Sequence, residues 1–105
     1  MKPGIAVHPK LNGFGAAPDA ASTPEGVEVS FDLGVNRNRQ STSQVIVTNR
    51  EALAGNTLEV SFAEGRLWFA IAPRTTIAFP VMTHRMRLRG TTGATALYSV
   101  MGIIT

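Results

Sequence analysis

Apolar and polar residues alternate along most of the chain after residue 26, which is the pattern of half-buried β-strands. Residues 27–33 (VEVSFDL) show it plainly, since every second residue is Val, Phe or Leu and those between are charged or carry a hydroxyl. β-branched runs such as QVIVT also favour strands. The pattern predicts about seven strands: 27–33, 44–49, 57–63, 66–72, 75–81, 83–89 and 95–104.

The stretch Leu58–Arg89 organises this prediction, because it holds four of these strands and the turns between them. An acidic-glycine pair at 64–65 and a Pro-Arg pair at 73–74 are turn signals. Pro80 indicates an edge position or a strand end. The last strand, 95–104, is uncharged, so we expect it to be central in a sheet or buried in a subunit interface.

Alternation also assigns side chains to faces. It places Ser61 and Trp68 outward, although Trp68 would be buried if both faces of its strand were covered. The residues of the stretch that are expected to face the core are Leu58, Val60, Phe62, Leu67, Phe69, Ile71, Ile77, Phe79, Val81, His84, Met86 and Leu88.

The fold class follows from these strands. A chain of 105 residues is expected to form one domain. Short strands with turn signals between them, and no helix of normal length, predict an all-β fold. We expect a small, jelly-roll-like β-sandwich of antiparallel strands over residues 27–105.

Residues 1–26 are expected to form an extended N-terminal arm. The segment holds four of the six prolines and four of the ten glycines, which disfavour a helix or a central strand. It also carries four apolar residues that need to be covered: Ile5, Val7, Leu11 and Phe14. They could pack along their own domain or lie on a neighbouring subunit. We favour an ordered arm that ties subunits together.

The composition excludes some classes of function. There is no cysteine, so disulfides and thiolate chemistry are excluded. No apolar run approaches the length of a membrane-spanning helix, and the first ten residues lack a signal-peptide core. The net charge is +3, and residues 65–105 hold five arginines and no acid. An acidic surface on a partner would complement the arginines of residues 65–105, although solubility alone also explains this charge.

The sequence contains no catalytic or metal-binding constellation. His8 and His84 are the only histidines, and neither has a third ligand at metal-site spacing. No nucleophile elbow, P-loop or dinucleotide fingerprint occurs. We therefore expect neither an enzyme nor a bound cofactor or metal.

The arginine row of strand 83–89 is the sharpest local feature. Arg85, Arg87 and Arg89 share one face at intervals of about 6–7 Å, so they repel one another unless an anion faces them. The row could be a solvated face, a protein interface or a phosphate-binding surface. Trp68 could serve as an anchor for a protein or a platform for a sugar.

The span Leu58–Arg89 resembles small bacteriophage virion proteins. The shared pattern is a strand like LEVSF, an acidic-glycine turn, WFAIAP, an apolar strand, the basic strand HRMRLRG and a final apolar strand like LYSVMGII. The turn at 63–65 (AEG) departs from the commoner Asp-Gly-Gly type. The resemblance implies a β-sandwich subunit of a phage head, such as a decoration or cement protein. It assigns no role to any single residue.

The expected function is therefore that of a non-enzymatic virion structural protein, made in the cytoplasm of a bacterial host and carried on the phage head. Its expected partners are the major capsid protein and copies of itself, in a homo-oligomer or on a lattice, with no membrane. The expected contact residues are Arg85, Arg87, Arg89, Trp68, Ile5, Val7, Leu11 and Phe14. One alternative is a carbohydrate-binding or adhesin-like module of a fibre or tail, with Trp68 and Tyr98 as platforms. A basic nucleic-acid-binding module is the least favoured.

Overall fold

The computed structural model is all-β, with eight antiparallel strands and no helix in the residues it describes. It describes residues 8–31, 42–51, 56–62, 67–91 and 93–104, and for residues 8–12 and 104 only the backbone. The strands are β1 (His8–Ala17), β2 (Val27–Ser30), β3 (Thr42–Asn49), β4 (Leu58–Ser61), β5 (Phe69–Ile71), β6 (Thr76–Phe79), β7 (Arg85–Gly90) and β8 (Ala96–Ile104).

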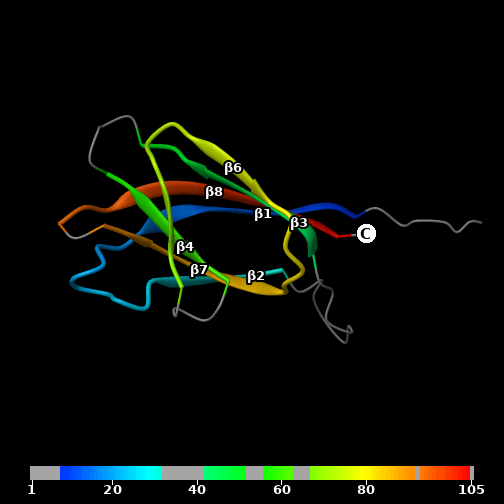
Figure 1. The fold of residues 1–105 in the computed structure, drawn as a ribbon, viewed down its shortest axis with the longest axis horizontal. Helices are drawn as coiled ribbons and strands as arrows, with labels where there is room; N and C mark the ends of the chain where they lie inside the picture. The colour runs from blue at the N-terminus through cyan, green and yellow to red at the C-terminus, as the bar shows by residue number, and fades with distance from the viewer. Residues whose placement is uncertain (1–7, 32–41, 52–55, 63–66, 92, 105) are drawn as a thin grey trace, which may run out of the picture.

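The strands pair in a nested order: the first with the last, the second with the seventh, the third with the sixth and the fourth with the fifth. Pairing of β3 with β8 and of β4 with β7 joins these pairs into two four-stranded sheets. Their orders are β1-β8-β3-β6 and β2-β7-β4-β5. In Figure 1 the first sheet lies above the second.

One hydrophobic core receives side chains from both sheets. On β3, Val45 and Val47 are fully buried, and on β7 Met86 and Leu88 are buried in the same way. Burying one such side chain contributes roughly 1.5–3 kcal/mol. The core cluster consists of Ala17, Phe31, Val45, Val47, Leu58, Val60, Ile71, Met86, Leu88, Ala96, Tyr98 and Val100.

Two glycines let large rings lie flat against the first sheet. A Cβ on Gly102 would come within 2.6 Å of the Phe31 ring, and one on Gly15 would meet the Tyr98 ring and hydroxyl. Such contacts are too close for any side chain, so the rings occupy the space that the missing Cβ atoms leave. The strand positions of these glycines are therefore a packing requirement.

Asn49, the last residue of β3, links the two sheets. It is fully buried, and its side-chain amide donates to the carbonyls of Ile71 on β5 and of Asn56, both at 2.9 Å. Its side-chain oxygen accepts the backbone N–H of Glu51 at 3.0 Å. A buried amide of this kind is stable only because each of its polar atoms is satisfied.

The structure confirms the all-β class but has eight strands where about seven were expected. The additional strand is β1, which lies in the segment predicted to be an extended arm and pairs with β8. Proline and glycine are tolerated there because an edge strand uses only one of its backbone edges for pairing. Residues 1–7 lie outside the described residues, so contact between the arm and another subunit stays a prediction.

Other expectations about strand positions are confirmed. β8 is central in its sheet, as its lack of charge indicated, and β6 is an edge strand that ends directly before Pro80. The predicted turn at 64–65 and most of the predicted connections at 34–43 and 50–56 lie outside the described residues.

The exposure of three side chains differs from the expectation. Ser61 pairs with Arg87 and so lies on the outward face as expected, but it is fully buried. Phe69 pairs with the buried Val60 and shares its face, yet Phe69 is 43% exposed, and Leu67 is 56% exposed. β5 is a three-residue edge strand, which explains why side chains before its last residue, the buried Ile71, are exposed.

Candidate functional site

The arginine row lies on the outward face of a central strand and is faced by acids of its own chain. β7 is flanked by β2 and β4, and each of these strands supplies a glutamate. Glu28 on β2 is 3.7 Å from Arg85, and Glu59 on β4 is 2.7 Å from Arg89. The anion that the arginine row was expected to need is therefore present within the chain.

Arg89 is held firmly. Its Nε donates to Glu59 at 2.7 Å, and its Nη1 donates to the carbonyl of Pro24 at 2.7 Å. Its guanidinium carbon lies 3.9 Å from the centre of the Trp68 ring. With one ring face covered in this way, Trp68 acts as part of an intramolecular cluster. We assign Arg89 and Trp68 a structural role.

The ion pairs of Arg85 with Glu28 and of Arg87 with Glu25 are longer than that of Arg89 with Glu59. The Arg85–Glu28 pair spans 3.7 Å, and both side chains are over 40% exposed. Arg87 lies 3.8 Å from Glu25, which is itself 85% exposed, and makes a 3.4 Å hydrogen bond to the carbonyl of that residue. Exposed pairs of this length contribute little free energy and exchange readily with other anions.

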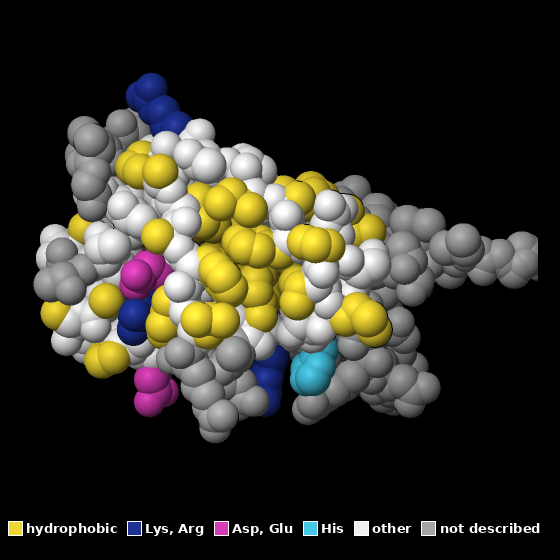
Figure 2. Space-filling model, viewed as in Figure 1, with side chains coloured by type: hydrophobic (Ala, Val, Ile, Leu, Met, Phe, Trp, Pro, Cys, Tyr) yellow, Lys and Arg dark blue, Asp and Glu magenta, His cyan; other side chains and the backbone are white. Residues whose placement is uncertain are grey.

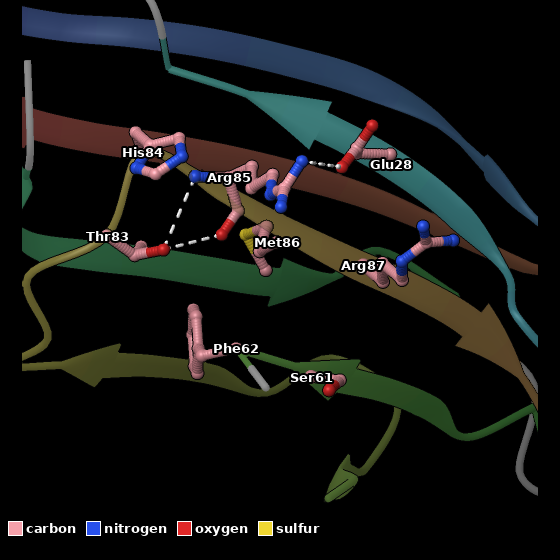
Figure 3. A pocket seen from close by; sticks show the side chains of 8 residues that line it. All are labelled: Glu28, Ser61, Phe62, Thr83, His84, Arg85, Met86 and Arg87. Atoms are coloured by element: carbon pink, nitrogen blue, oxygen red, sulfur yellow. Dashed lines mark hydrogen bonds and ion pairs between the residues drawn. The ribbon is translucent and has the colours of Figure 1, made fainter. Parts of the chain in front are cut away.

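A hollow of about 130 Å³ opens beside these two arginines, and we call it the β7 hollow. It is lined by Glu28, Ser61, Phe62, Thr83, His84, Arg85, Met86 and Arg87. Figure 3 shows Met86 extending from β7 toward Phe62, whereas Arg85 turns the other way, toward Glu28. The Thr83 hydroxyl donates to the carbonyl of Arg85 at 2.6 Å and fixes the approach to the strand.

A second feature is the aromatic edge, formed by Phe62, Phe69 and Phe79. Their ring centroids are 5.0 Å apart for Phe62 and Phe79 and 6.0 Å for Phe69 and Phe79. β5 and β6 are edge strands of different sheets, so this cluster lies across the open side of the fold. In Figure 2 hydrophobic side chains gather between β6 and β4. Phe69 is 43% exposed.

The third feature is the outward face of the first sheet, which we call the β8 outer face. The outward strand positions whose side chains the structure describes carry no charge and are mostly apolar: Phe14, Ala16, Gln44, Ile46, Thr48, Thr76, Ala78, Leu97, Ser99, Met101 and Ile103. Phe14 is 69% exposed and Leu97 43%. Arg50, directly after β3, lies 5.6 Å from the Phe14 ring. A shallow hollow of about 130 Å³ on this face is lined by Phe14, Ile46, Met101 and neighbouring residues.

The eight predicted contact residues do not form one site. Arg85, Arg87, Arg89 and Trp68 lie on the second sheet or beside it, whereas Phe14 lies on the opposite sheet. Ile5 and Val7 lie outside the described residues, and of Leu11 only the backbone is described. The lack of charge in strand 95–104 indicated a central or interface strand, but the sequence did not show that Phe14, Ile46 and Leu97 would share one outward face with it.

Tyr98 is not available as a sugar platform. It is 7% exposed and belongs to the core, and burial raises the pKa of its hydroxyl. Among the described residues no three His, Asp or Glu side chains are grouped closely enough to hold a metal ion. The described chain also has no helix with the length and apolarity that crossing a bilayer requires.

Comparisons with protein-family models, with curated proteins and with solved structures find no match to this chain.

Proposed function

We propose that the chain is a jelly-roll subunit of a bacteriophage particle and that it decorates or cements the capsid without catalysing a reaction. Eight antiparallel strands in two sheets with a nested pairing support the jelly-roll part of this proposal, because a jelly roll has eight strands in two sheets. Jelly rolls form viral capsid domains, lectins and cupins. The resemblance of Leu58–Arg89 to small virion proteins favours the first of these.

The observation that carries the proposal is the β8 outer face. An antiparallel sheet with one solvated face normally carries polar residues on that face. Here the outward positions are uncharged, and Phe14 and Leu97 present large apolar groups to solvent. A face of this composition is suited to burial against another protein.

The size of this face favours lattice binding over a stable pair. The strands β1, β8, β3 and β6 have 10, 9, 8 and 4 residues, which at a rise of about 3.3 Å and a spacing of about 4.8 Å give a footprint of roughly 500 Å². A stable interface needs about 800 Å² per partner. One contact would therefore be weak, but a symmetric shell repeats it many times and can hold the subunit through multivalency. The proposed partners are the major capsid protein and further copies of this chain.

The test is co-sedimentation of the purified chain with expanded phage capsids, together with the melting temperature of the shells. We expect saturable binding at a fixed number of copies per capsid and a higher melting temperature. Leu97→Lys places a charge at an exposed apolar position near one end of the face and should abolish binding without unfolding the chain. Ala21→Lys, an exposed change on the β1–β2 connection, should bind as the unmodified chain does. Equal binding by the two variants would contradict the role given to this face.

A further inference from the structure

The free edge of β6 carries none of the features that normally prevent pairing with another chain. β6 (Thr76–Phe79) is the last strand of its sheet, and β3 is its one neighbour among the described strands. Its four residues are uncharged; two are β-branched and one is aromatic, which favours strand pairing. Proteins usually protect such an edge with a charged residue, a proline or a covering segment. β6 contains neither a charge nor a proline.

The register of β6 against β3 shows which backbone groups point to the free edge. Asn49 on β3 donates its N–H to the carbonyl of Thr75 at 3.0 Å. Along a strand the N–H and C=O groups alternate in direction, so those of Ile77 also point to β3. Thr76 and Ala78 therefore direct their N–H and C=O groups away from β3. We call these outward backbone groups the β6 edge.

The segment that can pair through the β6 edge is short and centred on Ile77. Arg74 has a φ of 60° and donates its N–H to the carbonyl of Asn49 at 2.9 Å, so the extended backbone begins after it. Pro80 has no N–H to donate. Arg74 and Pro80 lie at equal distances along the chain from Ile77, so the segment between them is symmetric about that residue.

A symmetric segment is complementary to a second copy of itself. Antiparallel pairing about Ile77 places Thr76 of each copy opposite Ala78 of the other, so every outward N–H meets an outward carbonyl. The two Arg74 side chains would lie at opposite ends, roughly 20 Å apart, where they repel each other little. A two-fold contact of this kind is closed, so it stops at two copies. Register and charge therefore favour a second copy as the occupant.

Apolar side chains beside the β6 edge would be covered by the same contact. Phe69 is 43% exposed, and its ring centroid lies 6.0 Å from that of Phe79 on β6. Leu67, two residues before Phe69, is 56% exposed. Figure 2 shows the hydrophobic side chains that gather on this side of the fold. A neighbouring copy would remove part of this apolar surface from water.

We propose that two copies of the chain pair through the β6 edge, with Ile77 on the two-fold axis. About 17 Å of strand across the roughly 20 Å thickness of two sheets is a contact of roughly 300 Å² per copy, so the pair is weak in solution. It joins the two first sheets into one sheet, with both β8 outer faces on the same side. Their combined footprint of about 1,000 Å² exceeds the area that a stable contact needs. That use of the pair rests on the proposed function, whereas the pairing itself needs no capsid.

The test is disulfide cross-linking between copies of the full chain, which has no cysteine of its own. In the pair, Ile77 faces Ile77 of the other copy with Cα atoms about 4.5 Å apart, which a disulfide can span. Ala78 faces Thr76 instead, although Ala78 is exposed and Ile77 is partly buried. With oxidised glutathione, Ile77→Cys should form covalent dimers at least about tenfold faster than Ala78→Cys. Equal rates, or faster cross-linking of the more exposed cysteine, would overturn the proposal.

Two proline variants test the backbone pairing. Ala78→Pro removes an outward N–H, a change that an edge strand tolerates. Ala16→Pro is the matched control on β1, the other edge strand of the sheet: Leu97, which lies opposite Ala16, accepts the N–H of Arg50 on the β3 side, so the N–H of Ala16 also points outward. In sedimentation velocity up to about 1 mM, the unmodified chain and Ala16→Pro should form dimers and Ala78→Pro should stay monomeric, with an unchanged unfolding midpoint. Monomers of the unmodified chain at every concentration, or loss of the dimer in Ala16→Pro alone, would overturn the proposal.

Capsid binding separates this inference from the proposed function. If Ile77→Cys cross-links as expected but the chain does not bind capsids, the proposed function fails and the pairing stands. If the chain binds capsids but Ile77→Cys cross-links no faster than Ala78→Cys, the inference alone fails. If pairing and capsid binding both occur, Ala78→Pro should bind capsids more weakly than Ala16→Pro, and equal binding would overturn the joint use of the two β8 outer faces.

Discussion

Replacing Asn49 with alanine should destabilise the domain by about 2–4 kcal/mol. The change removes two hydrogen bonds of 2.9 Å, to the carbonyls of Asn56 and Ile71, and one of 3.0 Å from the N–H of Glu51. A buried group left without a partner costs about 1–3 kcal/mol. The bond to Ile71 is the buried one, and the other two groups can partly recover water. Most of the lost free energy of unfolding therefore comes from the hydrogen bond that links β3 to β5.

Urea unfolding followed by the fluorescence of Trp68 measures this loss. The midpoint of Asn49→Ala should fall with an unchanged m-value, and its melting temperature should drop by on the order of 10–20 °C for a domain of this size. Thr48→Ala is the control, because it removes only an exposed hydroxyl pair with Thr76, at 2.9 Å, and should cost less than about 1 kcal/mol. A loss below about 1 kcal/mol for Asn49→Ala would refute the view that this side chain links the sheets.

Three further changes test other parts of the account. Arg89→Ala should lower the free energy of unfolding, measured in urea, by about 1.5–3 kcal/mol, because it leaves the partly buried Glu59 without its partner. A loss below about 0.5 kcal/mol would contradict the structural role of Arg89. Gly102→Ala should lower the free energy of unfolding by about 1–3 kcal/mol, because the added methyl group overpacks the core against the Phe31 ring. Gly13→Ala is the control and should be nearly neutral, because its Cβ would meet its nearest atom at 3.6 Å. Equal effects of the two changes would argue against the close packing at Gly102. Hydrogen bonds from backbone N–H groups, first that of Gly93, lower the pKa of the Asp19 carboxyl. The ionised carboxyl therefore stabilises the fold above the ordinary aspartate pKa of about 3.9, and this stabilisation is lost as the pH falls through the lower folded-state pKa. Urea midpoints of the unmodified chain and of Asp19→Asn should therefore differ by a constant amount above about pH 5 and converge as the pH falls below about 4, and a difference that does not change with pH would contradict this.

The alternation of the sequence was sufficient to predict the strands that are buried on one face. β4 and β7 are central strands, and their inward residues Val60, Met86 and Leu88 are buried where a period of two placed them. The rule failed at the edges. β5 has one neighbouring strand, so Phe69 is 43% exposed although it pairs with the buried Val60 and shares its face.

The site was less predictable, because its geometry depends on pairings between distant segments. The arginine row was recognised, but its glutamates come from β2 and β4, and only the register of those strands against β7 brings Glu28 and Glu59 to it. Nothing in the sequence separated the firmly held Arg89 from the loosely held Arg87. The β7 hollow likewise joins residues of β4 and β7 that local patterns do not connect.

The β8 outer face and the β7 hollow differ in chemistry and lie on opposite sheets. The β8 outer face presents mostly apolar side chains, and the β7 hollow lies on the opposite sheet. Pairing of two copies through the β6 edge would leave the β8 outer face free, so one subunit could touch a second copy and the capsid at once. This arrangement suits a protein that reinforces a shell.

The central claim, that the chain is a structural component of a phage particle, is tested most directly by quantifying it in purified virions by mass spectrometry with an isotope-labelled standard. The account predicts a fixed copy number per particle that follows the symmetry of the head and persists through gradient purification. Absence from purified particles, in cells that make both the chain and the particles, would contradict it.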